Sequence, residues 1–356
     1  MKTPRLALVA ASVVALTLSA CGSGDSDTAS TADGGSTDAG TSEEVEILLP
    51  FPEGLPMAPV VVAKEQGIFA DNGLPNVKVS VADGSGYVSQ QLVSGNIDFA
   101  LMGSADVAVA ASKRDDVRVL FCHQANNVYR IGALAETGVT DLEGMAGKTL
   151  GITEPGGGEN AMVRAALADA GLTDQVQTLP IGGAGPQSLN ALQSGQAQGF
   201  SSSYPDFVQL SSEGVEFVDI TPAKYANVPG TCMTTTEEFL ATDAGKQQAI
   251  AVTQSWIEAE QFVIDSRDEA FEIVCGAVPS ACENEDAAQA LFDEAIAVME
   301  PDDDSRIGDT TPEVWATVVE ILSAGETVPA DLDLTANVSG GLVQEVRDAA
   351  YEALGM

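Results

Sequence analysis

Histidine and basic residues are scarce in this sequence. Its 356 residues include one histidine, His123, and 15 lysines and arginines against 53 aspartates and glutamates, for a formal charge of −38. A surface of this charge repels nucleic acid and anionic lipid, so we expect no nucleic-acid partner. The sequence also has no G-x-S-x-G, H-E-x-x-H or P-loop motif. We therefore expect no catalytic residue, no cofactor and no metal, and the chain is not expected to be an enzyme.

C-x-x-C spacing is absent as well. Apart from Cys21, the cysteines are Cys122, Cys232, Cys275 and Cys282. With a lone histidine beside them, their spacing does not indicate a zinc site. Four cysteines in an exported chain suggest two disulfides, with three possible connectivities. Cys275 and Cys282 flank "GAVPSA", a natural turn between two helices, so we predict the pairs Cys275–Cys282 and Cys122–Cys232.

No apolar run of membrane-spanning length follows the N-terminal segment. Residues 1–20 have a basic start and a short apolar run, which is typical of a secretory signal peptide. They lead into "LSAC", which resembles the bacterial lipobox and implies a lipidated, palmitate-type Cys21. The alternative is ordinary signal cleavage with Cys21 as a spare thiol. Residues 21–44 hold no large apolar residue and predict a flexible linker.

One phrase occurs twice in the chain. "QLVSGNIDFALMGSAD" occupies residues 91–106, and "ALQSGQAQGFSSSYPD" occupies residues 191–206. The residues that recur are Leu92, Ser94, Gly95 and Asp106, as Leu192, Ser194, Gly195 and Asp206. We expect each Ser-Gly pair to end a helix and turn the chain into a strand. We expect both aspartates to cap the helix that follows, behind a ligand rather than in contact with it.

Each copy lies in a segment with the order β-α-β-α-β, which is typical of a parallel sheet with covering helices. The first segment starts with a strand at 45–51 and a helix over 58–73. The capping-box spacing of Thr140 and Glu143 predicts a short helix there, and that of Thr235 and Glu238 predicts another. A strand at 129–135 and a segment near 228–236 are expected to cross between the two halves.

These elements predict an α/β fold of two lobes, each a parallel-rich sheet with flanking helices, joined by a two-strand hinge. We assign residues 45–130 and 232–356 to lobe 1, with the mostly helical C-terminal part as a buttress, and residues 131–231 to lobe 2. Ligands of open α/β sheets bind outside the carboxyl ends of the strands. Glycine-containing loops such as "EPGGGEN" follow these ends, and glycine and helix N-termini let backbone N–H groups approach a ligand.

Four segments together resemble a known family: "APVVVAKEQGIFADNGL", "QQLVSGNIDFALMGSAD", "LEGMAGKTLGITEPGGG" and "ALQSGQAQGFSSSYPD". The chain resembles the solute-binding lipoproteins of ABC importers for nitrate, sulfonates, taurine and thiamine-type pyrimidine precursors. The resemblance implies a periplasmic-binding-protein-like fold of type II that closes on a small solute and delivers it to an ABC permease. It implies a monomer, lipid-anchored at the extracytoplasmic face of the cell membrane. Gln198 departs from the family, which often has aspartate there.

The resemblance also implies a set of solute-binding residues at the strand ends. From lobe 1 and the hinge these are Phe51, Pro56, Met57, Ser85, Gly86, Gly103, Ser104, Asn127 and Tyr129. From lobe 2 they are Gly157, Gly158, Glu159, Ser203 and Tyr204. The loops carry five acids and few bases other than Arg130. An unpaired carboxylate beside an anion is costly, which favours a neutral, zwitterionic or amine-bearing solute such as a pyrimidine or an amino-sulfonate.

Two other functions fit the same sequence. A membrane-tethered sensor would need the same closure, with a signalling partner in place of a permease. A pyrimidine-synthase-like enzyme of this fold would use a histidine of its own chain, and His123 is the only one present.

Overall fold

The computed structural model describes residues 44–356, except for residues 83, 156–157 and 302–304. Outside the described residues lie the predicted signal peptide, Cys21 with its predicted lipid, the predicted linker up to residue 43 and the candidate Gly157. Within the described part, every helix is too short or too polar to cross a membrane.

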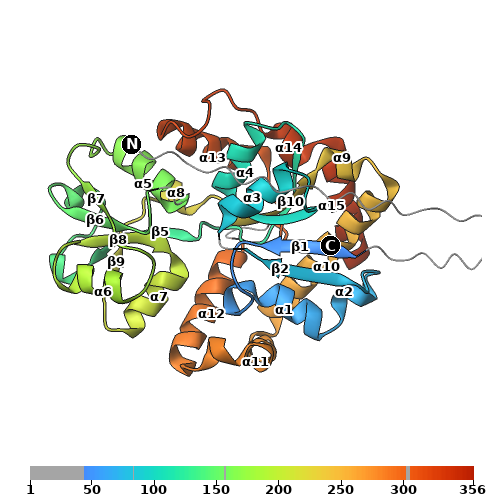
Figure 1. Cartoon of the computed structure of the whole chain (residues 1–356), viewed down its shortest axis with the longest axis horizontal. Coiled ribbons are helices and arrows are strands. Elements are labelled where there is room, and N and C mark those ends of the chain that lie inside the picture. The colour runs from blue at the N-terminus through green and yellow to red at the C-terminus, as the bar shows by residue number, and fades with distance from the viewer. Residues whose placement is uncertain (1–43, 83, 156–157, 302–304) are drawn as a thin grey trace, which may run out of the picture. The chain divides into compact units, whose positions relative to one another are not determined.

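Two mixed sheets organise the described chain (Figure 1). Sheet A has the order β2-β1-β3-β10-β4, in which β1 is parallel to β2 and β3, and β10 is antiparallel to β3 and β4. Its strands are β1 (Val45–Leu49), β2 (Val77–Val81), β3 (Phe99–Gly103), β4 (Val117–Cys122) and β10 (Thr231–Thr236).

Sheet B repeats this arrangement with the order β7-β6-β8-β5-β9. Strand β6 is parallel to β7 and β8, and β5 is antiparallel to β8 and β9. Its strands are β5 (Tyr129–Leu134), β6 (Thr149–Ile152), β7 (Gln177–Pro180), β8 (Gly199–Ser203) and β9 (Phe217–Asp219). We refer to sheet A with its helices as lobe 1 and to sheet B with its helices as lobe 2. The exact domain limits given above remain a prediction.

The helices of lobe 1 come from both ends of the described chain. Those before the crossing to lobe 2 are η1 (Leu55–Met57), α1 (Ala58–Glu65), α2 (Ile68–Asp71), α3 (Ser85–Val93) and α4 (Ser104–Ala111). Those after the return are α9 (Glu237–Leu240), α10 (Asp243–Asp265), α11 (Arg267–Ala277), η4 (Pro279–Cys282), α12 (Glu285–Met299), α13 (Pro312–Ala324), α14 (Thr335–Ser339) and α15 (Gly341–Leu354). Lobe 2 contains η2 (Ala135–Thr137), η3 (Glu143–Met145), α5 (Gly158–Asp169), α6 (Pro186–Gln193), α7 (Tyr204–Ser212) and α8 (Ala223–Ala226).

Three apolar clusters hold these layers together. Helices α1, α10, α12 and α15 cover one face of sheet A around the fully buried Trp256. Helices α3, α4 and α13 cover its other face, and α13 also packs against α5 of lobe 2 in the cluster that contains Trp315. Helices α6 and α7 cover the second face of sheet B around Phe200. Because one cluster includes residues of both sheets, the two lobes pack on each other through apolar side chains.

The repeated phrase has the same structural role in both lobes. Gly95 and Gly195 follow α3 and α6 with φ of 70° and 72°, in the left-handed region that glycine adopts without a steric penalty. The predicted helix-to-strand turns at these two positions are confirmed. Gln198, where the family often has aspartate, accepts a hydrogen bond from the Thr149 N–H at 3.0 Å and thereby joins this turn to β6.

Two irregular segments connect the lobes, residues 123–128 and residues 227–230. They are hydrogen-bonded to each other, since the Gly230 N–H donates to the Gln124 carbonyl at 3.0 Å, and the Asn127 N–H donates to the carbonyl of Ala226, the last residue of α8, at 3.0 Å. Both predicted disulfides are present, and Cys122 lies directly opposite Cys232 where β4 pairs with β10. All four cysteines are used in these bonds, so none of them is available as a zinc ligand.

Local expectations from the sequence were wrong at four places. The strand expected to cross between the lobes at 129–135 is β5, which lies within sheet B, and the irregular residues 123–128 make the crossing instead. The helix expected over 58–73 is broken into α1 and α2 at Gly67, whose φ is 76°. No α-helix starts at Thr140, where the Asp141 carboxylate accepts the Gly144 N–H at 2.9 Å and only the short η3 follows. The cap of α9 is Thr236 rather than Thr235, because its hydroxyl accepts the Phe239 N–H at 3.2 Å.

Candidate functional site

The carboxyl ends of β2 and β3 bring three polar groups of lobe 1 together. Ser85 begins α3, and its hydroxyl accepts the Gly103 N–H at 2.8 Å. The same hydroxyl is hydrogen-bonded to Asp106 in the first turn of α4. Burial raises the pKa of the Asp106 carboxyl, while the Ser85 hydrogen bond and the more distant Lys113 act in the opposite direction.

Ser104 connects this group to the hinge. It is the first residue of α4 and is 9% exposed. Its hydroxyl donates to the Pro229 carbonyl at 2.6 Å, and its N–H donates to the Gly230 carbonyl at 2.8 Å. The N-terminus of α4 is therefore fixed to the segment that returns from lobe 2.

On the side of lobe 2, Tyr129, Gly158 and Glu159 face the lobe 1 group formed by Ser85, Gly103 and Asp106. A Cβ on Gly158, the first residue of α5, would lie 2.6 Å from the Tyr129 hydroxyl, so glycine is what allows this contact. Glu159 is 3% exposed and accepts hydrogen bonds from the Thr153 N–H and hydroxyl. Burial raises the pKa of Tyr129, and the carboxylates of Asp106 and Glu159 raise it further. We call Asp106, Tyr129, Gly158 and Glu159 the interlobe site.

Other predicted residues adjoin this site or the hinge. Ser203 lies opposite Tyr129 in the pairing of β5 with β8 and precedes α7. Asn127 is part of the hinge, where its side chain donates to the Tyr225 carbonyl at 2.7 Å and accepts the Tyr129 N–H at 3.0 Å. Phe51, 37% exposed, and Gly86, also exposed, lie at the edge of lobe 1 formed by the ends of β1 and β2.

Three predicted residues lie away from the interlobe site. Met57 is fully buried in the core between α1 and sheet A, because η1 turns its side chain inward. Tyr204 is 2% exposed and packs toward α12. The Pro56 carbonyl faces the buried His123, with its oxygen 3.2 Å from Nε2. The sequence does not distinguish these inward positions from exposed ones, since both follow a strand end.

The sequence predicted that the two repeated aspartates are N-caps, and this prediction was wrong. The N-cap residues of α4 and α7 are Gly103 and Ser203, so each aspartate is the third residue of its helix, in the first turn. Asp206 accepts the Ala184 N–H at 2.9 Å and a hydrogen bond from Ser202, which ties α7 to the loop before α6. Asp106 makes the equivalent tie to Ser85, the first residue of α3. The repeat thus encodes one carboxylate bridge per lobe.

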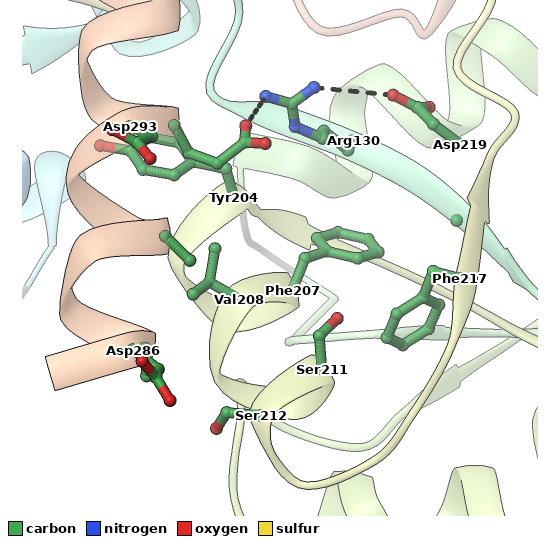
Figure 2. Close-up of a pocket in the computed structure, with 14 residues that line it drawn as sticks. Arg130, Tyr204, Phe207, Val208, Ser211, Ser212, Phe217, Asp219, Asp286 and Asp293 are labelled. Carbon is green, nitrogen blue, oxygen red and sulfur yellow. Dashed lines mark hydrogen bonds and ion pairs between the residues drawn. The ribbon is translucent and has the colours of Figure 1, made fainter. Parts of the chain in front are cut away.

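A cavity of about 650 Å³ lies on the other face of β5, between α7, β9 and α12 (Figure 2). Aromatic and acidic side chains line it, including Phe207, Phe217, Asp286 and Asp293. We call it the α7–α12 cavity. It was not expected from the sequence, because α12 belongs to the C-terminal part that carries no recognisable site motif.

Arg130 points into the α7–α12 cavity and away from the interlobe site. Its guanidinium donates to Glu294 of α12 at 2.7 Å. It also lies 3.6 Å from the carboxylate of Asp219 in β9, and Figure 2 shows these two side chains pointing toward each other. Neighbouring residues of a strand point to opposite faces, so Tyr129 and Arg130 cannot serve the same site. The one base that the sequence offered for an anionic solute is therefore engaged by two carboxylates elsewhere.

Comparisons with known proteins agree with this architecture. The model of the NMT1-like family matches residues 40–278. No curated protein sequence matches the chain. A solved structure from Bordetella bronchiseptica RB50 is similar, with 21% identity over 88% of this chain and 98% of that chain and a TM-score of 0.66.

Two further solved structures are similar to the chain. The periplasmic nitrate-binding protein NrtA from Synechocystis PCC 6803 has 18% identity over 88% of this chain and 89% of its own, with a TM-score of 0.61. The periplasmic aliphatic sulphonate binding protein SsuA from Escherichia coli has 13% identity over 82% and 91%, with a TM-score of 0.62. At these identities the likeness establishes the fold, and the fold class and family resemblance stated from the sequence are confirmed.

Proposed function

The chain belongs to the NMT1-like family, and on that basis we propose that it is a solute-binding protein of an ABC importer. In this proposal its two lobes close on a small organic solute at the interlobe site and deliver it to a permease. We further propose that the protein is a monomer held at the extracytoplasmic face of the cell membrane by a lipid on Cys21.

One structural observation carries the proposal. Helix α4, with Asp106 in its first turn, follows β3 and packs against helix α5, which follows β6 and has Glu159 in its first turn. In the described chain, two irregular segments connect the lobes. Two rigid sheets with a narrow connection are suited to hinge motion around a ligand between them. The names of the similar structures, which specify nitrate and aliphatic sulphonate binding, support the same class of function.

A pyrimidine-synthase-like activity is not part of the proposal. His123 is 0% exposed, and its ring nitrogens face the Glu260 carboxyl at 3.3 Å and the Pro56 carbonyl at 3.2 Å. A side chain in this position has no access to a solute between the lobes.

Thermal unfolding with added solutes tests the proposal, because a ligand that binds only the folded protein raises its melting temperature. The panel comprises nitrate, sulfonates, taurine, pyrimidines, flavins and organic amines. We expect Ser203→Arg, which places a long side chain beside Tyr129, to abolish the shift. Ser212→Arg is the matched control, since Ser212 is exposed and lines the α7–α12 cavity.

Both variants must first show the melting temperature of the wild-type protein without solute. No stabilisation of the wild type by any class of solute would refute the proposed function. A shift that survives Ser203→Arg and disappears in Ser212→Arg would move the solute to the α7–α12 cavity.

A further inference from the structure

We propose that the solute is an organic cation with an apolar group, held at its charged nitrogen by Asp106 and Glu159 and at its apolar part by Phe51 and Tyr87. This inference rests on the proposed function, because it assigns a chemical class to the solute of the interlobe site. Tyr87 and Asp106 were not among the solute-binding residues predicted from the sequence.

Both lobes contribute negative charge to the interlobe site. Asp106 comes from the first turn of α4 in lobe 1, and Glu159 from the first turn of α5 in lobe 2. Helices α4 and α5 pack against each other, and Gly158, which precedes Glu159, lies so close to Tyr129 that an added Cβ would be 2.6 Å from the Tyr129 hydroxyl. Both carboxylates also raise the pKa of Tyr129, to which burial contributes most. Closure of the lobes therefore brings two acids around one position, and a cation between them would relieve their repulsion.

Among the described residues at the strand ends, no basic side chain offsets the charge of these two acids. The described residues of the loops at 50–57, 82–86, 103–106 and 154–159 include no lysine or arginine. Arg130 is paired with Glu294 and Asp219 on the opposite face of β5. Lys113, beyond the C-terminal end of α4, is the one basic residue that acts on Asp106. An anionic solute would meet two largely buried carboxylates with no guanidinium or ammonium partner beside it.

Most of the large, exposed apolar side chains lie at one edge of lobe 1. Among the described residues, the large exposed ones are Phe51 (37%), Val81 (46%), Tyr87 (53%) and Met356 (43%). Three of these four lie together: Val81 ends β2 beside Leu49 of β1, Phe51 follows β1, and Tyr87 is in the first turn of α3.

Backbone hydrogen bonds hold this apolar edge beside the interlobe site. The Gly84 N–H donates to the Pro50 carbonyl at 3.0 Å, which joins the loop before Phe51 to the start of α3. Ser85, the first residue of α3, is bonded to Asp106. Aromatic rings next to carboxylates suit a solute that is apolar at one end and cationic at the other.

A cationic solute would distinguish this chain from two structures that share its fold. Those two structures are named for nitrate and aliphatic sulphonate, both of which are anions. We expect this chain to reject such solutes, because the charge at its strand ends has the wrong sign for them.

The test uses pairs of compounds with one carbon skeleton and opposite charge. Benzylamine and phenylmethanesulfonate form one pair, and 2-phenylethylamine and 2-phenylethanesulfonate form another. Binding to the full-length protein is measured by isothermal titration calorimetry at near-neutral pH. We expect the amines to bind and the sulfonates not to bind.

Variants assign the binding to named residues. Asp106→Asn and Glu159→Gln are each expected to weaken amine binding at least about tenfold, the equivalent of one charge-assisted hydrogen bond. Tyr87→Ser is expected to weaken it severalfold, and it should fold normally because the side chain is 53% exposed. Asp286→Asn removes an equal charge at the α7–α12 cavity and should leave the affinity unchanged.

The outcomes distinguish this inference from the function on which it rests. Binding of the sulfonates in place of the amines would overturn the inference and leave a solute-binding protein. Amine binding that is lost in Asp286→Asn but kept in Asp106→Asn would also overturn it. Binding of neither series, together with no thermal shift from any solute in the wider panel, would refute the proposed function itself.

Discussion

Removal of the Cys122–Cys232 disulfide, by changing both cysteines to alanine, is expected to lower the free energy of unfolding by about 5 kcal/mol. The bond spans 110 residues of sequence, and the closed loop contains every strand of lobe 2. Cross-linking a chain lowers the entropy of its unfolded state, and the effect grows with the logarithm of loop length. The same relation gives about 2 kcal/mol for Cys275–Cys282, which spans 7 residues.

The burial of Cys122 and Cys232 should increase the difference in unfolding free energy between the two disulfide variants. Cys122 and Cys232 are 2% and 0% exposed, whereas Cys275 and Cys282 are half-buried. Replacing the buried pair therefore also removes core contacts. The Cys275→Ala/Cys282→Ala variant serves as the matched control, because it deletes the same atoms from a short loop near the surface.

Equilibrium unfolding in urea, followed by tryptophan fluorescence, measures both variants. Trp256 and Trp315 lie in separate apolar clusters and are 0% exposed, so their emission reports loss of packing on both faces of sheet A. We expect the Cys122/Cys232 variant to lose at least twice as much free energy as the control. Equal losses, or a greater loss in the control, would refute the loop-entropy reasoning.

Two further predictions concern buried charged groups. Burial raises the pKa of Glu260, so its contribution to stability is present below the usual glutamate pKa of about 4.3 and is lost as pH rises through the raised value. Glu260→Gln should therefore become more stable relative to the wild type as pH rises above 4, measured by urea midpoints; a constant difference would contradict this. Arg347, 2% exposed, donates to four backbone carbonyls, so Arg347→Leu should cost about 3–5 kcal/mol in urea unfolding. The exposed ion-paired Arg267→Leu should cost at most about 1 kcal/mol, and similar losses in both would show that the buried donors contribute little.

The fold could be predicted because its repeated signals are local. A glycine after an amphipathic helix, as at Gly95 and Gly195, fixes a helix end wherever the chain is placed, since few other residues adopt positive φ freely. The alternation of strands and helices then indicates parallel sheets. Gly67 also adopts positive φ and ends a helix, but it lies within a longer apolar stretch. The predicted helix over 58–73 therefore continued across it, and this prediction was wrong.

The solute-binding residues stay a prediction, and the directions of their side chains could not be inferred from the sequence, because these depend on distant packing partners. Met57 and Tyr204 follow strand ends, as ligand-binding residues do, but α1 and α12 bury them. Successive side chains of a strand point to opposite faces, so Tyr129 and Arg130 of β5 cannot face the same solute. This alternation alone predicts that Arg130 does not contact an anion beside Tyr129. The role of Asp106 was visible in the repeat only as an unexplained match to Asp206.

The position of β10 has a consequence for the order in which the lobes can be completed during synthesis. The strand that joins β3 to β4 in sheet A is made after all strands of lobe 2, since β10 begins at Thr231 and pairs with both β3 and β4. Until the ribosome has released that segment, β3 and β4 each have an unpaired edge open to other chains. The strands of lobe 2 form one continuous stretch of the chain from β5 to β9, so sheet B can be completed before sheet A.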